Sequence, residues 1–180
     1  MSDPLKKLLQ GMVAAMHLLN KAIDKRSALE CIVLQSNIID GALRVGLILK
    51  AQLDSGTNEI DDSLLKQAET DPKMPERAIF QRCLANGVID TTLFDTLTAL
   101  YEKRNRCIHR YLLTDIDYDY ATSLVFDLDA ALKAVNDAIY RLEREQIEKS
   151  VGMTTSGPEA TTEYLKQFAA NKEKLHNLDD

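Results

Sequence analysis

The residues with the clearest chemical potential lie together in one short stretch, residues 104–111. Arg104 is followed by four residues and then by His109, and Tyr111 comes one residue later. A guanidinium binds phosphate oxygens in a bidentate geometry, and an imidazole titrates near neutral pH, so that it can act as a general acid or base. This combination is suited to chemistry on a phosphodiester.

Further basic residues in the same stretch allow a plainer interpretation. Lys103, Arg106 and Arg110 are candidates for substrate binding, and no acidic residue lies between them. Cations near the C-terminal end of a helix are, however, favoured by the helix dipole whatever their function. The stretch therefore also fits a solvated basic helix end, or a structural ion pair with Asp115 or Asp117.

Helix geometry limits how Arg104 and His109 can cooperate. At about 100° per residue, the two side chains lie roughly 140° apart around a regular helix. Asn105 and Arg106 instead share a face with His109, because they precede it by four and three positions. One helix therefore supplies half a site, and a symmetric dimer would bring two such halves across one cleft.

Composition restricts the classes of function. The chain has 180 residues, of which 45% are apolar, enough for one domain with an ordinary core. The net charge of −6 does not favour a general nucleic-acid-binding surface, so any contact with RNA has to be local. The histidines and cysteines form no metal-ligand cluster in the sequence, and we expect neither a metal nor a cofactor.

The cysteines and the hydropathy pattern favour a cytoplasmic protein. Cys31, Cys83 and Cys107 are odd in number and widely spaced, which favours a reducing compartment and three small core residues. The sequence shows no apolar run of about 18 residues, and we therefore expect no membrane span.

Helical periodicity dominates the chain and predicts an all-α fold, an antiparallel bundle of four main helices with short extra helices. Residues 1–149 are expected to form the helical domain, and residues 150–180 a linker and a C-terminal helical tail. The predicted helices cover residues 3–25, 28–53, 60–69, 75–86, 90–113, 118–149 and 159–175.

The helix predicted over residues 28–53 is nearly apolar all round and should therefore lie at the centre. Ser27 and Glu30 have the spacing of a capping box at its start. Gly41 and Gly46 lower its helix propensity, and we expect them to permit close approach of neighbouring helices.

A polar stripe crosses this otherwise apolar helix. Asn37, Asp40 and Arg44 are spaced by three and four positions, so they share a face. Two interpretations are open: Asp40 supports the site by reaching Arg104 or His109, or Asp40 and Arg44 form a local pair on a solvated strip.

The pattern formed by Arg104, His109 and Tyr111 resembles the signature of the HEPN superfamily, in the form found in HEPN toxins of bacterial toxin–antitoxin pairs. Asn105 matches the polar residue that commonly follows the arginine in that family. The resemblance covers about residues 1–149. It implies a metal-independent endoribonuclease that acts as a homodimer in a toxin or anti-phage defence system.

The same resemblance implies a role for each residue of the motif. His109 would act as general base or acid on the 2′-hydroxyl of RNA, and Arg104 would hold the scissile phosphate. Asn105 would orient His109 or the phosphate. The substrate would be RNA, because only RNA carries the attacking 2′-hydroxyl.

Tyr111 has two interpretations that remain open. In HEPN toxins the matching tyrosine is the site where a nucleotidyltransferase antitoxin attaches AMP, which implies such an antitoxin as a partner. The other interpretation is an amphipathic tyrosine that covers the end of a helix.

An alternative function is a non-catalytic HEPN-like module for regulation or protein interaction. Transcription regulators of the mannitol-repressor type are also helical and resemble this chain weakly around residues 87–105. In that case the motif would serve dimerisation or partner binding, and residues 152–180 would form a partner-binding tail.

Overall fold

The computed structural model describes residues 3–65 and 74–156. Within these residues it contains five α-helices and three short 3₁₀ helices, and no strand, which confirms the all-α class. The α-helices are α1 (Asp3–Asp24), α2 (Ala28–Ser55), α3 (Glu76–Ala85), α4 (Thr91–Arg110) and α5 (Tyr118–Lys149), and the 3₁₀ helices are η1 (Asp62–Leu64), η2 (Tyr111–Leu113) and η3 (Met153–Ser156).

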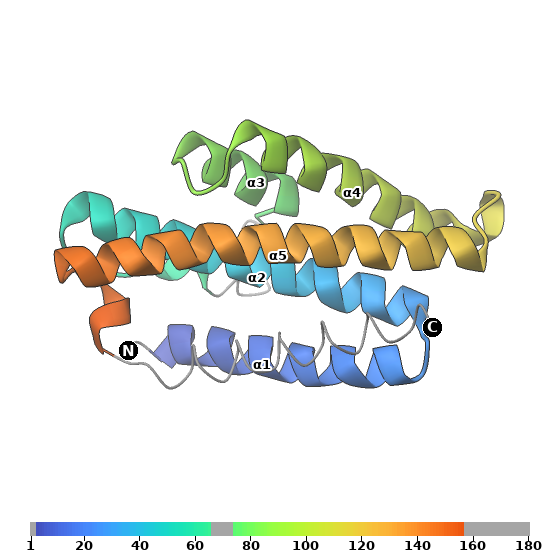
Figure 1. Ribbon diagram of the computed structural model, residues 1–180, viewed down its shortest axis with the longest axis horizontal. Coiled ribbons are helices and arrows are strands. Elements are labelled where there is room, and N and C mark those ends of the chain that lie inside the picture. The colour runs from blue at the N-terminus through green and yellow to red at the C-terminus, as the bar shows by residue number, and fades with distance from the viewer. Residues whose placement is uncertain (1–2, 66–73, 157–180) are drawn as a thin grey trace.

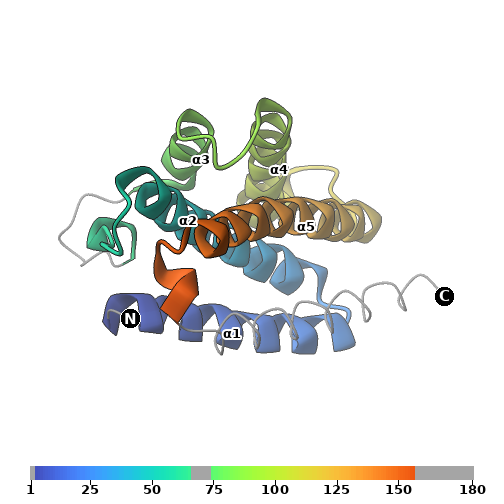
Figure 2. The ribbon, with the colours of Figure 1, turned by 60° about the vertical axis from the view of Figure 1, so that its left-hand side comes forward.

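The helices form three layers, which Figures 1 and 2 show from two directions. Helices α2 and α5 lie in the middle, α1 covers one side of them, and α3 and α4 cover the other. Consecutive long helices run antiparallel, as the sequence predicts. The central pair, however, runs parallel, because the α3–α4 hairpin returns the chain to the end at which α2 began.

Hydrogen bonds at both ends fix the parallel direction of the central pair. At the first end, the Tyr118 hydroxyl at the start of α5 donates to the carbonyl of Arg26, just before α2, at 3.1 Å. At the other end, Gln146 Nε2 donates to Gln52 Oε1 at 3.0 Å. The prediction of an antiparallel bundle is therefore correct for α1–α2, α3–α4 and α4–α5, and wrong for this pair.

Helix α2 occupies the centre, as its apolar sequence predicts, and has buried residues on all sides. By length and composition it is also the one helix among the described residues that could cross a membrane. The expectation that no apolar segment is long enough to span a membrane is therefore wrong by length and composition. Of its most apolar 18-residue segment, 67% is buried inside the protein, as in the core helix of a globular domain.

Both glycines within α2 lie where a neighbouring side chain approaches the backbone. A Cβ at Gly46 would lie 2.7 Å from Val88 Cγ1, which is closer than van der Waals contact allows. A Cβ at Gly41 would lie 3.3 Å from the side chain of Met12 on α1. The predicted close approach of a neighbouring helix is confirmed at Gly41, whereas at Gly46 the closest side chain comes from the loop between α3 and α4.

Local signals set most helix ends. Helix α3 ends before Gly87, which adopts φ = +70°, and the Val88 amide donates to the carbonyl of Cys83 at 2.9 Å. Helix α4 begins after Asp90, whose carboxylate accepts from the Leu93 amide at 2.8 Å. The predicted capping box at Ser27 is wrong: α2 starts there, but the Ser27 side chain makes no capping hydrogen bond.

At the C-terminal end of the central pair, two fully buried glutamines form a polar network. Gln146 Nε2 donates both to Gln52 Oε1 and to the carbonyl of Leu49, each at 3.0 Å. Gln146 Oε1 accepts from the amide and hydroxyl of Thr154, at 3.1 and 2.8 Å. Gln52 Oε1 also accepts from the Met153 amide at 3.0 Å. Residues of the expected linker are thereby bonded to the core.

The rest of the network involves the loop after α2. Gln52 Nε2 donates to the carbonyls of Asn58 and Glu59, both at 3.2 Å. The Gly152 amide donates to Asn58 Oδ1 at 2.8 Å. Of the helix predicted over residues 60–69, the structure describes residues 60–65, in which Asp62–Leu64 form the 3₁₀ helix η1. The tail helix predicted over residues 159–175 lies outside the described residues.

Candidate functional site

The motif lies in the last two turns of α4, where the chain turns toward α5. The side chain of Arg104 points inward and is only 16% exposed, whereas His109 is exposed to solvent. The two side chains therefore do not converge within one copy of the chain, as their spacing on a regular helix predicts. His109 is not buried against its own core, so it remains accessible to a ligand or to a second copy.

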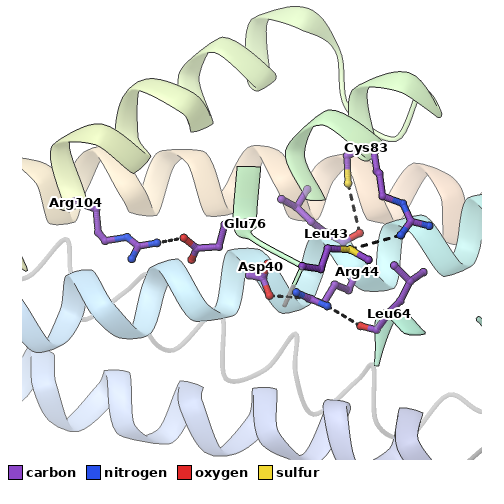
Figure 3. Close-up of polar contacts among 9 residues, drawn as sticks. Asp40, Leu43, Arg44, Leu64, Glu76, Cys83 and Arg104 are labelled. Atoms are coloured by element: carbon purple, nitrogen blue, oxygen red, sulfur yellow. Dashed lines mark hydrogen bonds and ion pairs between the residues drawn. The ribbon is translucent and has the colours of Figure 1, made fainter. Parts of the chain in front are cut away.

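Arg104 is held by two neighbours that sequence reasoning missed. Its Nη2 forms an ion pair with the carboxylate of Glu76, at the start of α3 (Figure 3). Its guanidinium also lies over the ring of Tyr101, with Cζ 5.0 Å from the ring centroid. Burial lowers the pKa of Arg104, and the negative charge of Asp40 opposes that shift.

A second arginine uses the same aromatic ring. Arg77 Cζ lies 5.2 Å from the centroid of Tyr101, and Arg77 Nη2 forms an ion pair with Glu102. Both partners of this second pair are largely exposed, with side-chain exposures of 52% and 58%. Helices α3 and α4 are thus joined by two Arg–Glu pairs, one largely buried and one in solvent.

The solvent side of α4 carries the rest of the motif. Arg106 and Arg110 are exposed, as is His109, whereas Asn105 is half-buried. The described residues show no ion pair to either exposed arginine. This face therefore combines an imidazole with two guanidiniums that are open to solvent.

Lys103 differs from these arginines in having an ion-pair partner on another helix. Its Nζ forms an ion pair with Asp127 Oδ2 on α5 at 2.8 Å. The hydrogen bond to Asp127 raises the pKa of Lys103. In this arrangement Lys103 ties α4 to α5, and Asp127 compensates its charge.

Apolar side chains lie exposed beside the basic face. Ile108, Leu112 and Leu113 are 36%, 92% and 83% exposed. The helical spacing of Ile108 and Leu112, which continues that of Leu97, Leu100 and Tyr101, predicts instead that they lie on the core face of this helix. That prediction is wrong: Leu112 lies beyond the end of α4, in η2, and Ile108 lies on the solvent side of the last turn of α4. In their place Cys107 is fully buried.

Tyr111 is the first residue of η2 and lies half-buried against the core. This position fits the interpretation of an amphipathic tyrosine that covers the helix end. Of the two acids considered as structural partners, Asp117 serves instead as a helix cap, since its Oδ1 accepts from the Tyr120 amide at 2.8 Å at the start of α5. Arg104 pairs with Glu76, 28 positions away.

The polar stripe of α2 forms the local pair that was one of its two interpretations. Arg44 Nε donates to Asp40 Oδ2 at 2.7 Å, and Arg44 Nη1 donates to the carbonyl of Leu64 at 3.0 Å (Figure 3). The stripe lines an open cavity of about 550 Å³ between α1 and α2. Its walls are formed by Lys7, Leu8, Gly11, Met12, Ala15, Asn37, Ile38, Asp40, Gly41, Arg44, Leu64 and Leu65.

Within the described ranges, no group of three or more histidine, cysteine or acidic side chains is placed to hold a metal ion. Cys31, Cys83 and Cys107 are buried free thiols, which confirms their expected place in the core. Burial raises the pKa of Cys31 to about 11 and that of Cys83 to about 12, so neither is a reactive thiolate near neutral pH.

The chain matches no family model, no curated protein and no solved structure. The geometry of α4 and the residues of its motif are therefore the basis for assigning a function.

Proposed function

We propose that this protein is a HEPN-type, metal-independent endoribonuclease that acts as a homodimer. The observation that carries the proposal is the exposure of His109 at the end of α4, on a face that also presents Arg106 and Arg110. An exposed imidazole flanked by two guanidiniums provides an acid–base group beside phosphate-binding donors. These exposed groups can bind the phosphates of an RNA backbone, and they take no part in packing the core of the bundle.

The reaction needs no group beyond the side chains of two copies. One His109 accepts the proton of the RNA 2′-hydroxyl, whose oxygen attacks the adjacent phosphorus. The bond from phosphorus to the 5′-oxygen breaks, and the His109 of the second copy donates a proton to that leaving oxygen. Arg104 stabilises the charge on the phosphate, and Asn105 orients the imidazole or the phosphate. The products are a 2′,3′-cyclic phosphate and a 5′-hydroxyl.

The activity test uses the purified full-length chain and RNA in the presence of EDTA. Wild type is expected to cleave, and Arg104→Ala and His109→Ala are each expected to lower the rate by about 100-fold or more, as for loss of an acid–base or charge-stabilising group. His17→Ala, which removes an exposed histidine of α1, is the matched control and should retain full activity. Cleavage at the wild-type rate by both motif variants would refute the assignment.

The exposed apolar residues beside His109 support a dimer through this end of α4. Leu112 and Leu113 expose most of their side chains, and burying them against a second copy would remove apolar surface from water. Two His109 side chains would then lie on either side of the interface.

We expect the double substitution Leu112→Ser and Leu113→Ser to convert the dimer into a monomer and to abolish cleavage. The fold should keep its stability to within about 0.5 kcal/mol, because neither side chain is buried within one copy. Light scattering coupled to size exclusion measures the change. Ile147→Ser, at another exposed apolar position 57% open to solvent, should leave both properties unchanged. A monomeric wild type with full activity would exclude the dimeric mechanism.

A second candidate is a non-catalytic HEPN-like or mannitol-repressor-like interaction module. The ion pair of Arg104 with Glu76 favours it, since this pair engages the phosphate-binding group within the protein. In that case wild type would not cleave RNA, and the nucleotidyltransferase that the toxin assignment implies would not modify Tyr111. Incubating the protein with ATP and such an enzyme, followed by mass spectrometry, separates the two candidates.

A further inference from the structure

The position that a phosphate would occupy on Arg104 is already taken by a carboxylate. The Glu76 side chain is 24% exposed and contacts Arg104 Nη2, while Arg104 itself is 16% exposed. Carboxylate and phosphate oxygens bind the same N–H donors of a guanidinium. A phosphodiester that binds this edge of Arg104 must therefore compete with Glu76.

We propose that Glu76 competes with the RNA phosphate for Arg104 and leaves when RNA binds. This inference rests on the proposed function, and it adds a residue that the motif does not contain. Tyr101 remains stacked on the guanidinium in both states, so Arg104 keeps its position while its anionic partner changes.

The charges around Arg104 favour exchange over joint binding. Asp40 lies close enough for its negative charge to act on Arg104, and Glu76 contacts it directly. Asp40 is itself paired with Arg44, so the competition concerns Glu76: a phosphodiester added beside Glu76 would place two anions on one partly buried cation, where like charges repel strongly. Exchange of one carboxylate for one phosphodiester leaves the local charge unchanged.

The position of Glu76 allows it to move away. It is the first residue of α3 and follows Pro75, so its backbone lies at a helix end. Its partly exposed carboxylate can turn into water without leaving a charge buried and unpaired. The cost of release is the ion pair itself, which the arriving phosphate replaces.

The chain contains a matched control in the second pair. Glu102 forms an ion pair with Arg77 over the same Tyr101 ring, but both side chains are largely exposed. Glu76→Gln and Glu102→Gln each remove one negative charge from the same region. A general charge effect would strengthen RNA binding equally in both variants, whereas competition at Arg104 would strengthen it only in the first.

The test measures binding of an oligonucleotide of 2′-O-methyl RNA, which cannot be cleaved because its attacking hydroxyl is blocked. We expect Glu76→Gln to bind about tenfold more tightly than wild type, equivalent to the loss of one competing ion pair. Glu102→Gln should change affinity by less than about twofold, because exposed pairs contribute little. In the Arg104→Ala background, Glu76→Gln should bring no gain.

A second variant separates competition from charge and from misfolding. Glu76→Asp keeps the negative charge but withdraws the carboxylate by one methylene, and it should also bind RNA more tightly than wild type. Thermal melting establishes that each variant is folded. Equal gains for Glu76→Gln and Glu102→Gln would overturn the proposal, as would weaker binding by Glu76→Gln. If wild type cleaves no RNA but the variants bind as expected, the nuclease assignment fails while the competition at Arg104 stands.

Discussion

The two ends of the central α2–α5 pair differ in how their buried side-chain amides are hydrogen-bonded. At the C-terminal end, Gln52 and Gln146 are fully buried, and their amide groups bond to each other, to backbone groups and to Thr154. Toward the N-terminal end of α2, Gln35 is equally buried, yet neither its Nε2 nor its Oε1 has a hydrogen-bond partner among the described residues. The motif of α4 lies toward this second end, with His109 exposed.

The difference indicates that the end with Gln52 and Gln146 contributes more to stability than the end with Gln35. Satisfied buried amides specify one arrangement of the chain, whereas an unsatisfied amide costs free energy without fixing anything. Exposed leucines add to the contrast, because Leu112 and Leu113 also lie at the motif end. Natural proteins tend to break such packing rules at functional sites, which agrees with the placement of the proposed site.

The largest effect that would test this comparison is expected at Gln146. Replacing it by Leu removes the side-chain hydrogen bond to the Leu49 carbonyl and leaves the Thr154 amide and hydroxyl without the acceptor that they use in the wild type. We expect a loss of about 3 kcal/mol in the free energy of unfolding, measured by urea titration.

Gln81→Leu on α3 is the control for this change, because Gln81 is exposed and its loss should change stability by less than about 0.5 kcal/mol. Gly152→Ala should reproduce the Gln146 effect, because Gly152 has φ = +90° and an added Cβ would overlap the Gln146 carboxamide. A Gln146→Leu protein as stable as wild type would remove the distinction between the two ends.

An effect of opposite sign is expected at Gln35. Gln35→Leu replaces a buried amide, which has no hydrogen-bond partner in the part of the chain that the structure describes, with an apolar group of similar size. The variant should therefore be more stable by about 1–2 kcal/mol. The same urea titration measures it. If Gln35→Leu is destabilised as strongly as Gln146→Leu, the two buried amides are equivalent, and the contrast does not hold.

The smallest effect is expected at Glu143, which lies one turn before Gln146 on α5. Burial raises the pKa of Glu143 on α5, so the folded state holds its proton more strongly than the unfolded state does. The folded state therefore loses stability as the pH rises through that raised pKa. Glu143→Gln should melt about 1–2 °C above wild type at pH 7, and this advantage should vanish at a pH below about 4, the range of an unfolded glutamate.

Glu148→Gln provides the comparison for Glu143, since its side chain is 69% exposed on the same helix, and the stability of this variant at pH 7 should stay within about 0.5 kcal/mol of wild type. An advantage of Glu143→Gln that grows toward acid pH would contradict the assignment of the shift to burial.

Local periodicity and capping predicted much of this fold. The apolar sequence of α2 indicated its central position, and Gly87 and Asp90 marked the boundary between α3 and α4. These signals succeed because they depend on residues within one or two turns of each other.

Features that depend on distant pairs were not predictable in the same way. Glu76 meets Arg104 across 28 positions, and nothing in the sequence near either residue distinguishes Glu76 from other surface acids. The same holds for the bond of Gln146 to Gln52, across 94 positions. Periodicity also cannot tell an apolar stripe that meets the core from one that extends past it, as happens at Leu112.

The glutamine network also sets the order in which the molecule can be completed during its synthesis. Helix α2 is made early, but the buried Gln52 Oε1 at its end accepts hydrogen bonds from Gln146 and Met153, which are made 94 and 101 positions later. Until these residues emerge from the ribosome, Gln52 Oε1 depends on water for a hydrogen-bond partner. A nascent chain that ends before residue 146 should therefore be open at this end and susceptible to proteases there. Chains that extend beyond residue 154 should be closed and resistant.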